Sequence, residues 1–206
     1  MAQSTLTADS GPLIDRIWAV GEQKLLRQAI LAVAGVALLT LSAKVQVPFY
    51  PVPMTLQTLV VLLIGAAYGW RLGAVTVGLY LLQGLAGLPV FANSWLAGPA
   101  YFLGPTAGFL VAFMASAAIT GYAVEKGAAR SLPLLAAAML LAQAVVFAVG
   151  ALWLAQFAQL ANGAHGAHGV GFARAWAVVQ TFLPGDLLKT AIAVALVSLF
   201  AHKTAG

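Results

Sequence analysis

The sequence predicts an all-α integral membrane protein, a bundle of six transmembrane helices. Of its 206 residues, 62% are hydrophobic and only 7% are charged, whereas soluble domains carry about 25% charged residues. The apolar residues also occur in long runs, and a helix needs about 20 of them to cross a bilayer. Six such runs take up most of the chain and leave no room for a separate soluble domain.

Each predicted span is an apolar run bounded by turn signals or charged residues. Prolines 48, 51 and 53 separate the first span from the second, and Gly69-Trp70-Arg71 is predicted as a tight turn between the second and third. The long fifth run is expected to tilt or to extend beyond the bilayer. The six spans are 25–43, 54–70, 72–88, 105–124, 132–160 and 184–201.

The chain divides into a tail, residues 1–24, and a membrane domain, residues 25–203. The tail carries acidic residues and lacks a long apolar core, so it is not a secretory signal. Residues 13–20 within it form either a short amphipathic helix on the membrane face or part of a flexible tail. Long loops are expected over 89–104 and 162–183.

The distribution of cations predicts the orientation in the membrane. If the amino terminus is inside, seven cations lie on the inner side and only Lys44 and Arg174 lie outside. By the positive-inside rule this predicts a multi-pass membrane protein with both termini cytoplasmic. The membrane is expected to be the bacterial inner membrane. Cations at span ends do not form a basic patch, which excludes nucleic acid as a partner. The inner cations are Arg16, Lys24, Arg27, Arg71, Lys126, Arg130 and Lys203.

Asp186 and Lys189 are the main candidate functional residues. They lie in an apolar run, where a charge costs about 3 kcal/mol or more and usually has a function. At i,i+3 they share a helix face. Pro184 is predicted in the first helical turn, which would put Asp186 near the positive end of the helix dipole. The alternative is a buried ion pair that only fixes helix packing.

Further candidates lie in the outer halves of the spans and in the 89–104 loop. Gln57 and Gln83 are uncharged polar residues that would line a pocket or make interhelical hydrogen bonds. In the loop, Phe91 and Trp95 supply apolar area and Asn93 supplies a donor and an acceptor; a loop that simply packs is the alternative. His165 and His168 have no nearby carboxylate or cysteine, so no metal is expected.

Four motifs occur in one order along the chain, and together they are similar to a known family. They are residues 47–58 (VPFYPVPMTLQT), 84–92 (GLAGLPVFA), 103–109 (LGPTAGF) and 183–189 (LPGDLLK). They resemble the BioY family, the biotin-specific substrate-binding (S) components of energy-coupling-factor (ECF) transporters. The resemblance extends from about residue 25 to residue 201.

The resemblance implies a six-helix bundle of the ECF S-component type, with biotin as the transported ligand and no cofactor or enzymatic activity. By motif, Asp186 would accept the ureido N–H groups of biotin and Asn93 would complement the remaining edge. Lys189 would serve either the ureido oxygen or the valerate carboxylate. Tyr50, Phe91 and Trp95 would cover the apolar parts.

The resemblance also implies partners, a transmembrane coupling subunit (T component) and ABC ATPase subunits, in addition to membrane lipid. The first span commonly docks the coupling subunit through an Ala-x-x-x-Ala pattern. The present sequence departs from it, and the stripe Ala29, Ala32 and Gly35 is the predicted substitute, since small residues allow close helix approach.

Two other functions fit the residues. The first is an S component for another small vitamin. The second is a small intramembrane enzyme that uses Asp186 with His165 or His168, which would require those histidines near Asp186. A purely structural membrane subunit is disfavoured by the charged pair.

Overall fold

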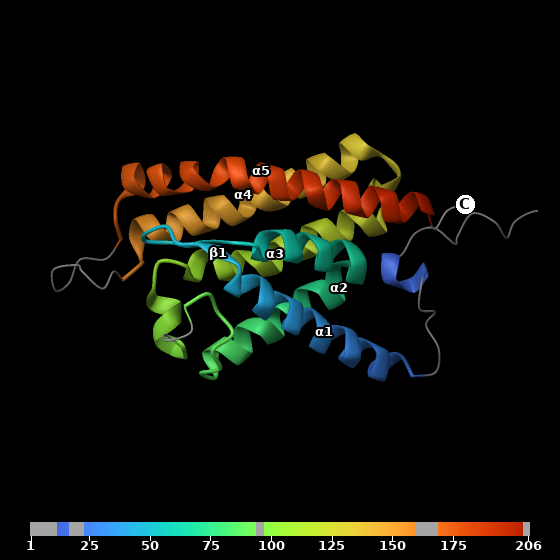
Figure 1. Cartoon of the computed structure of the whole chain (residues 1–206), viewed down its shortest axis with the longest axis horizontal. Coiled ribbons are helices and arrows are strands. Elements are labelled where there is room, and N and C mark those ends of the chain that lie inside the picture. Colours follow the sequence, from blue (N-terminus) through green and yellow to red (C-terminus); the bar gives the residue numbers. More distant parts are fainter. Residues whose placement is uncertain (1–11, 17–22, 94–96, 160–168, 204–206) are drawn as a thin grey trace, which may run out of the picture.

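The computed structural model describes residues 12–16, 23–93, 97–159 and 169–203, and long helices dominate it. They lie side by side along the longest axis of the molecule (Figure 1). A two-stranded antiparallel hairpin pairs Gln46 with Thr55 and Val47 with Met54. The elements are η1 (Leu13–Arg16), α1 (Lys24–Lys44), β1 (Gln46–Val47), β2 (Met54–Thr55), α2 (Gln57–Leu85), η2 (Pro99–Leu103), α3 (Ala107–Glu125), η3 (Ala128–Arg130), α4 (Leu132–Gln156) and α5 (Phe172–Lys203).

In the described residues, five helices are long and apolar enough to cross a membrane, compared with six predicted spans. The difference lies in α2, which contains both the second and the third predicted span. Gly69 inside it has a φ of 78° and leaves the helical conformation, which glycine does without steric cost. A Cβ at Gly73 would lie 3.3 Å from the Cα of Gly65. The chain therefore folds back at the predicted turn, giving α2 two arms, residues 57–68 and 70–85.

The start of α5 corrects the prediction for the last span. The helix begins at Phe172 and Pro184 lies inside it, so Pro184 is not in the first turn and Asp186 is not near the helix N-terminus. Residues before Pro184 continue the helix because Ala175, Val179 and Phe182, at helical spacing, are all buried. A proline is tolerated inside a transmembrane helix, where neighbouring groups satisfy the freed backbone. Much of the predicted 162–183 loop is consequently helical.

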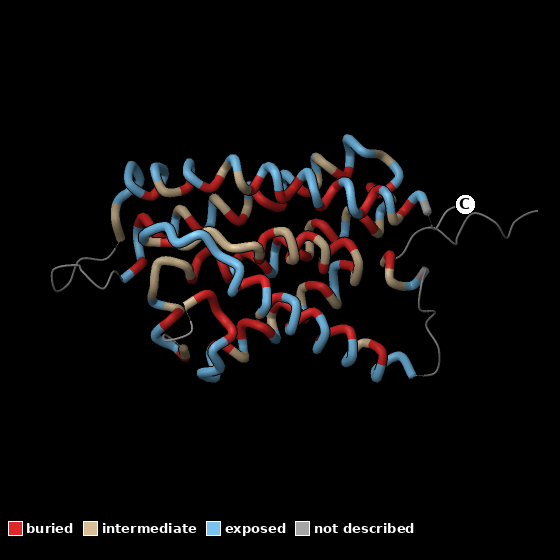
Figure 2. The backbone as a smooth tube through the Cα atoms, in the orientation of Figure 1, coloured by how far each residue is buried: buried red, intermediate tan, exposed pale blue. Residues whose placement is uncertain are grey.

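Along each helix, buried positions alternate with exposed ones (Figure 2). Near the hairpin the core is aromatic, with Tyr80, Phe91 and Phe109 among its members. A second cluster contains Leu62 and Met139. Large apolar residues are exposed on the outer helix faces, for example Val33 at 71% and Leu199 at 68%. Such an apolar exterior is what contact with lipid requires.

The amino-terminal piece docks on the bundle. Leu13 of η1 is only 3% exposed and belongs to the same core cluster as Leu62. Asp15 pairs with Arg27 of α1 at 2.6 Å. The predicted amphipathic segment thus places its first apolar residue within the protein; residues 17–20 of that segment lie outside the described part of the chain.

The predicted docking stripe on α1 is not an exposed face. Ala29 is exposed, but Ala32 and Gly35 are buried. A Cβ at Gly35 would lie 2.6 Å from Thr76 Cγ2 on the second arm of α2. Gly35 therefore serves close packing within the bundle, and Ala29 is the exposed member of the stripe. That the stripe docks a partner stays a prediction.

Candidate functional site

Asp186 and Lys189 form the buried ion pair expected from their spacing. Asp186 is 3% exposed and Lys189 is 9% exposed. Lys189 Nζ lies 2.6 Å from Asp186 Oδ1, as the shared helix face at i,i+3 allows. The opposite charges compensate each other in a region where a single charge would be costly.

Three other elements hold this pair in place. Thr58 Oγ1 of α2 donates a hydrogen bond of 2.7 Å to Asp186 Oδ1, and Gln143 Nε2 of α4 donates to Asp186 Oδ2. Lys189 Nζ donates to the backbone oxygen of Thr55 in β2 at 3.0 Å. Each carboxylate oxygen thus accepts at least one hydrogen bond, and the ammonium is fixed beneath the hairpin.

Next to the pair is a small cavity of about 50 Å³ between the hairpin segment, α3, α4 and α5. Its walls are apolar, and its polar atoms come from Thr55, Thr58, Asp186 and Lys189. Ligand pockets are usually about 300–1,000 Å³, so this cavity is smaller than a typical ligand pocket. Its lining residues are Val52, Pro53, Met54, Thr55, Thr58, Phe109, Phe113, Val146, Phe147, Phe182, Asp186 and Lys189.

The hairpin segment, residues 45–56, covers the cavity. Met54 packs closely on α5, since a Cβ at Gly185 would lie 2.7 Å from Met54 Sδ. The ring of Phe49 lies against Phe182 with centroids 6.1 Å apart. The hairpin segment therefore closes this side of the cavity.

Gln57 and Phe91 belong to a neighbouring network. Gln57 Nε2 donates to the Tyr80 hydroxyl at 2.7 Å, and that hydroxyl donates to the Val90 oxygen at 3.1 Å. Phe91 is 1% exposed and packs on Tyr80, with ring centroids 5.3 Å apart. Neither residue is among the described residues that line the cavity at Asp186.

The remaining predicted residues lie further from the pair or outside the described part of the chain. Tyr50 is 73% exposed on the hairpin segment, and Asn93 is half-buried in the loop. Gln83 lines an apolar groove between α1 and α2. Trp95 falls outside the described residues, as do both candidate metal-binding histidines, 165 and 168. Among the described residues no cluster suited to a metal ion is found.

Lys44 and Tyr101 fix the loop that carries Asn93. Lys44 Nζ at the end of α1 donates to the backbone oxygens of Pro89, at 2.8 Å, and Phe91. Burial raises the pKa of the Tyr101 hydroxyl, while hydrogen bonds with Thr106 and the Asn93 backbone partly offset that rise. The first part of the loop, around residues 89–93, is thereby attached to α1 and to η2.

Gln143, Thr58 and the aromatic walls were not predicted as site residues. Gln143 was one of several amides inside the spans, and its Oε1 is buried with no hydrogen-bond partner among the described residues. An acceptor left in this way can receive a hydrogen bond from a ligand. The available signal was its position as an amide in the middle of a long apolar run.

A multi-pass helical bundle with a buried, charged site beneath a hairpin defines a membrane protein of the solute-binding class. The model of the BioY family matches residues 13–205. The chain belongs to the BioY family.

Curated relatives agree with this assignment. The biotin transporter BioY of Rhizobium etli is 35% identical over 173 residues, covering 81% of this chain and 87% of that protein. The biotin transporter BioY of Rhodobacter capsulatus is 37% identical over 150 residues, covering 69% and 75%. The crystal structure of an S-component for biotin from an ECF-type ABC transporter superposes with a TM-score of 0.72 over 87% of this chain and 93% of that one. At 24% sequence identity, this superposition shows that the two proteins share a fold.

Proposed function

We propose that the chain is the biotin-binding S component of an ECF-type ABC importer and takes up biotin from the outer face of the membrane. The single observation that carries the proposal is the buried Asp186–Lys189 pair, 2.6 Å apart, on an aromatic-walled cavity in a member of this family. An ionised pair held by hydrogen bonds inside a membrane bundle is suited to a polar ligand.

The donors and acceptors of the site complement the ureido ring of biotin. Asp186 carries the acceptor oxygens for the ring N–H groups, and Gln143 Oε1, which is buried without a partner among the described residues, adds another acceptor. Lys189 Nζ supplies a donor for either the ureido oxygen or the valerate carboxylate. Phe109 and Phe182 in the cavity wall match the apolar ring and chain.

In this proposal the hairpin segment and the 89–104 loop cover the bound biotin. The hairpin segment, with Tyr50, moves outward to admit biotin and then closes over it. Asn93 approaches from the loop that Lys44 ties to α1. In this rearrangement the cavity of about 50 Å³ would enlarge.

The proposal includes the transmembrane coupling subunit and the ABC ATPase subunits as partners. It places the protein in the bacterial cell membrane with both termini cytoplasmic. The beginning of α1 and the end of α5 lie at the same end of the bundle (Figure 1), which fits termini on one side. The hairpin and the Asp186 cavity are then toward the outer side.

A titration of the purified protein with biotin, thiamine and riboflavin tests the function. Saturable binding of biotin, with much weaker binding of the other two, is the expected result. Preferential binding of thiamine or riboflavin would show that the transported ligand is another vitamin and not biotin. Conversion of the added compound to a product would identify an enzyme instead.

A further inference from the structure

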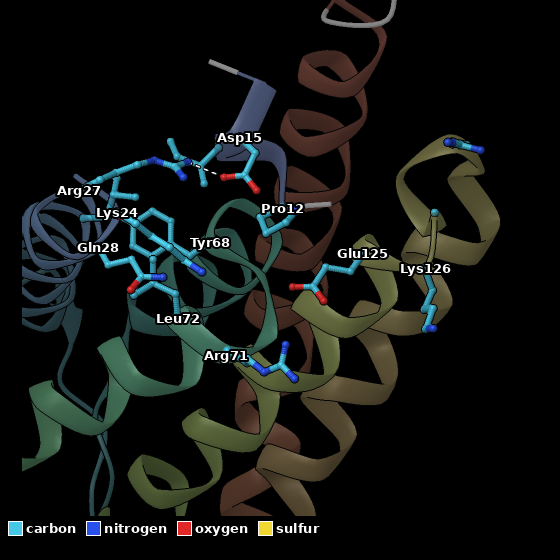
Figure 3. A pocket seen from close by; sticks show the side chains of 14 residues that line it. Pro12, Asp15, Lys24, Arg27, Gln28, Tyr68, Arg71, Leu72, Glu125 and Lys126 are labelled. Carbon is cyan, nitrogen blue, oxygen red and sulfur yellow. Dashed lines mark hydrogen bonds and ion pairs between the residues drawn. The ribbon is translucent and has the colours of Figure 1, made fainter. Parts of the chain in front are cut away.

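A larger cavity opens at the other end of the bundle, away from Asp186. It has a volume of about 620 Å³ and lies where the beginning of α1, the bend of α2 and the end of α3 meet (Figure 3). Proposed transport of biotin does not use it. The cavity lies at the end of the bundle where most cations of the chain are found.

The described lining of this cavity is strongly cationic, with five basic and two acidic side chains. The two acids are engaged with the protein: Asp15 pairs with Arg27 at 2.6 Å, and Glu125 Oε1 accepts the backbone N–H of Trp70 at 3.1 Å. The net charge favours an anionic ligand. The basic residues are Lys24, Arg27, Arg71, Lys126 and Arg130.

Aromatic residues place this cavity at a membrane–water interface. The Arg71 guanidinium lies over the Trp70 ring, 4.5 Å from its centroid, and Lys126 Nζ lies 5.4 Å from the centroid of Tyr122. Tryptophan and tyrosine are enriched at the headgroup level of the bilayer. These aromatic residues favour a position of the cavity near the headgroup level.

A second, apolar groove lies between α1 and the second arm of α2, further along α1 than the cavity. It has a volume of about 700 Å³ and is lined mostly by apolar residues, including Val36 of α1 and Leu79 of α2. On α1 the groove lining begins at Ala32, next to Leu31 of the cavity. On the second arm of α2, Thr76, which Gly35 contacts closely, lies between the two spaces. Val33 and Leu82, which also line the groove, are 71% and 60% exposed, so the groove is open to the bilayer.

We infer that a phospholipid with an anionic headgroup binds here, with its phosphate in the cationic cavity and an acyl chain along the groove between α1 and the second arm of α2. A charged end next to an apolar channel is complementary to a lipid, and basic pockets between transmembrane helices bind anionic headgroups. Free phosphate would satisfy only the cavity.

Native mass spectrometry of the delipidated full-length chain tests the inference. The probes are phosphatidylglycerol, phosphatidylcholine with the same acyl chains, and inorganic phosphate. We expect phosphatidylglycerol to bind at least tenfold more tightly than either of the others. Neutralising Lys24 and Arg71 together, as Lys24→Gln with Arg71→Gln, should weaken its binding about 25-fold, or about fivefold for each charge removed.

Arg174→Gln is the matched control, because it removes one exposed cation from the opposite end of the chain's membrane domain and should leave lipid binding unchanged. The two single variants replace the double variant if the latter does not fold. Equal binding of phosphatidylcholine, equal binding of inorganic phosphate, or an equal loss with Arg174→Gln would overturn the inference. So would a double variant that retains phosphatidylglycerol but loses the coupling subunit, since the cavity would then be a protein-docking site.

Discussion

At the scale of single residues, the chemistry of the proposed site depends on Asp186. Its oxygens accept hydrogen bonds from Thr58 and Gln143, and Lys189 balances its charge at 2.6 Å. Thr58 and Gln143 come from helices far from Asp186 in sequence. Each contact both stabilises the buried carboxylate and orients it toward the cavity.

The ion pair predicts strong coupling between Asp186 and Lys189. Lys189→Met alone leaves a buried carboxylate without its cation, which costs about 3–5 kcal/mol in comparable sites. Combining it with Asp186→Asn should recover much of that stability without restoring biotin binding. Thermal unfolding in detergent of both single variants and the double variant measures this. Stability losses that simply add would show that the two residues act independently.

Gln143 is predicted to serve both the fold and the ligand. Gln143→Met keeps the approximate volume but removes the donor to Asp186 and the unpartnered acceptor, so stability should fall by about 1–3 kcal/mol. Biotin affinity should fall as well. Calorimetric titration and thermal unfolding measure the two effects. Unchanged biotin affinity in a folded variant would remove Gln143 from the site.

At the scale of the elements, the bend of α2 and the long α5 position the site. The bend allows Thr58 on the first arm of α2 to meet Asp186 on α5, and α3 packs on the bend, where a Cβ at Gly121 would lie 2.4 Å from the Trp70 nitrogen. The proline inside α5 shows why soluble-protein rules misplaced the start of this helix. Proline usually ends a helix in water but is tolerated inside a membrane.

Gly69 is predicted to be required for the bend. Gly69→Ala would force a φ of 78° on a residue with a Cβ, 2.1 Å from Glu125 Oε1, and should destabilise the protein by more than about 1 kcal/mol. Gly78→Ala is the control, because its Cβ would meet only Met114, at 3.4 Å. Thermal unfolding compares them. Equal stability of the two variants would contradict this role of Gly69.

At the scale of the whole molecule, the membrane bundle and the charged pair could be predicted from the sequence, but the site around the pair could not. Composition and apolar runs dictate the class of fold, and Asp186 and Lys189 share a helix face wherever that helix begins. Phe109 and Phe182 resemble any other apolar residue of a span until the packing is known. The burial of Gly35 likewise depends on its contact with Thr76, which helical spacing alone does not define.

The proposed topology predicts opposite accessibility at the two ends. Because the chain has no cysteine, single cysteines can be placed at Phe172, 60% exposed, and Leu132, 58% exposed. In intact cells an impermeant thiol reagent should label Phe172→Cys and not Leu132→Cys. Labelling of Leu132→Cys alone would show that the orientation in the membrane is opposite to the proposed one.

The most direct test of the proposed function is the affinity of the purified protein for biotin before and after Asp186→Asn. Asp15→Asn is the matched control, since it makes the same change in an ion pair that Asp15 forms with Arg27, outside the Asp186 cavity. The wild-type protein and Asp15→Asn should bind biotin equally. Asp186→Asn should bind it at least tenfold more weakly, because a hydrogen bond to a charged group contributes about 1.5–3 kcal/mol and tenfold corresponds to about 1.4 kcal/mol. A folded Asp186→Asn protein with wild-type affinity, or a wild-type protein that does not bind biotin, would contradict the account.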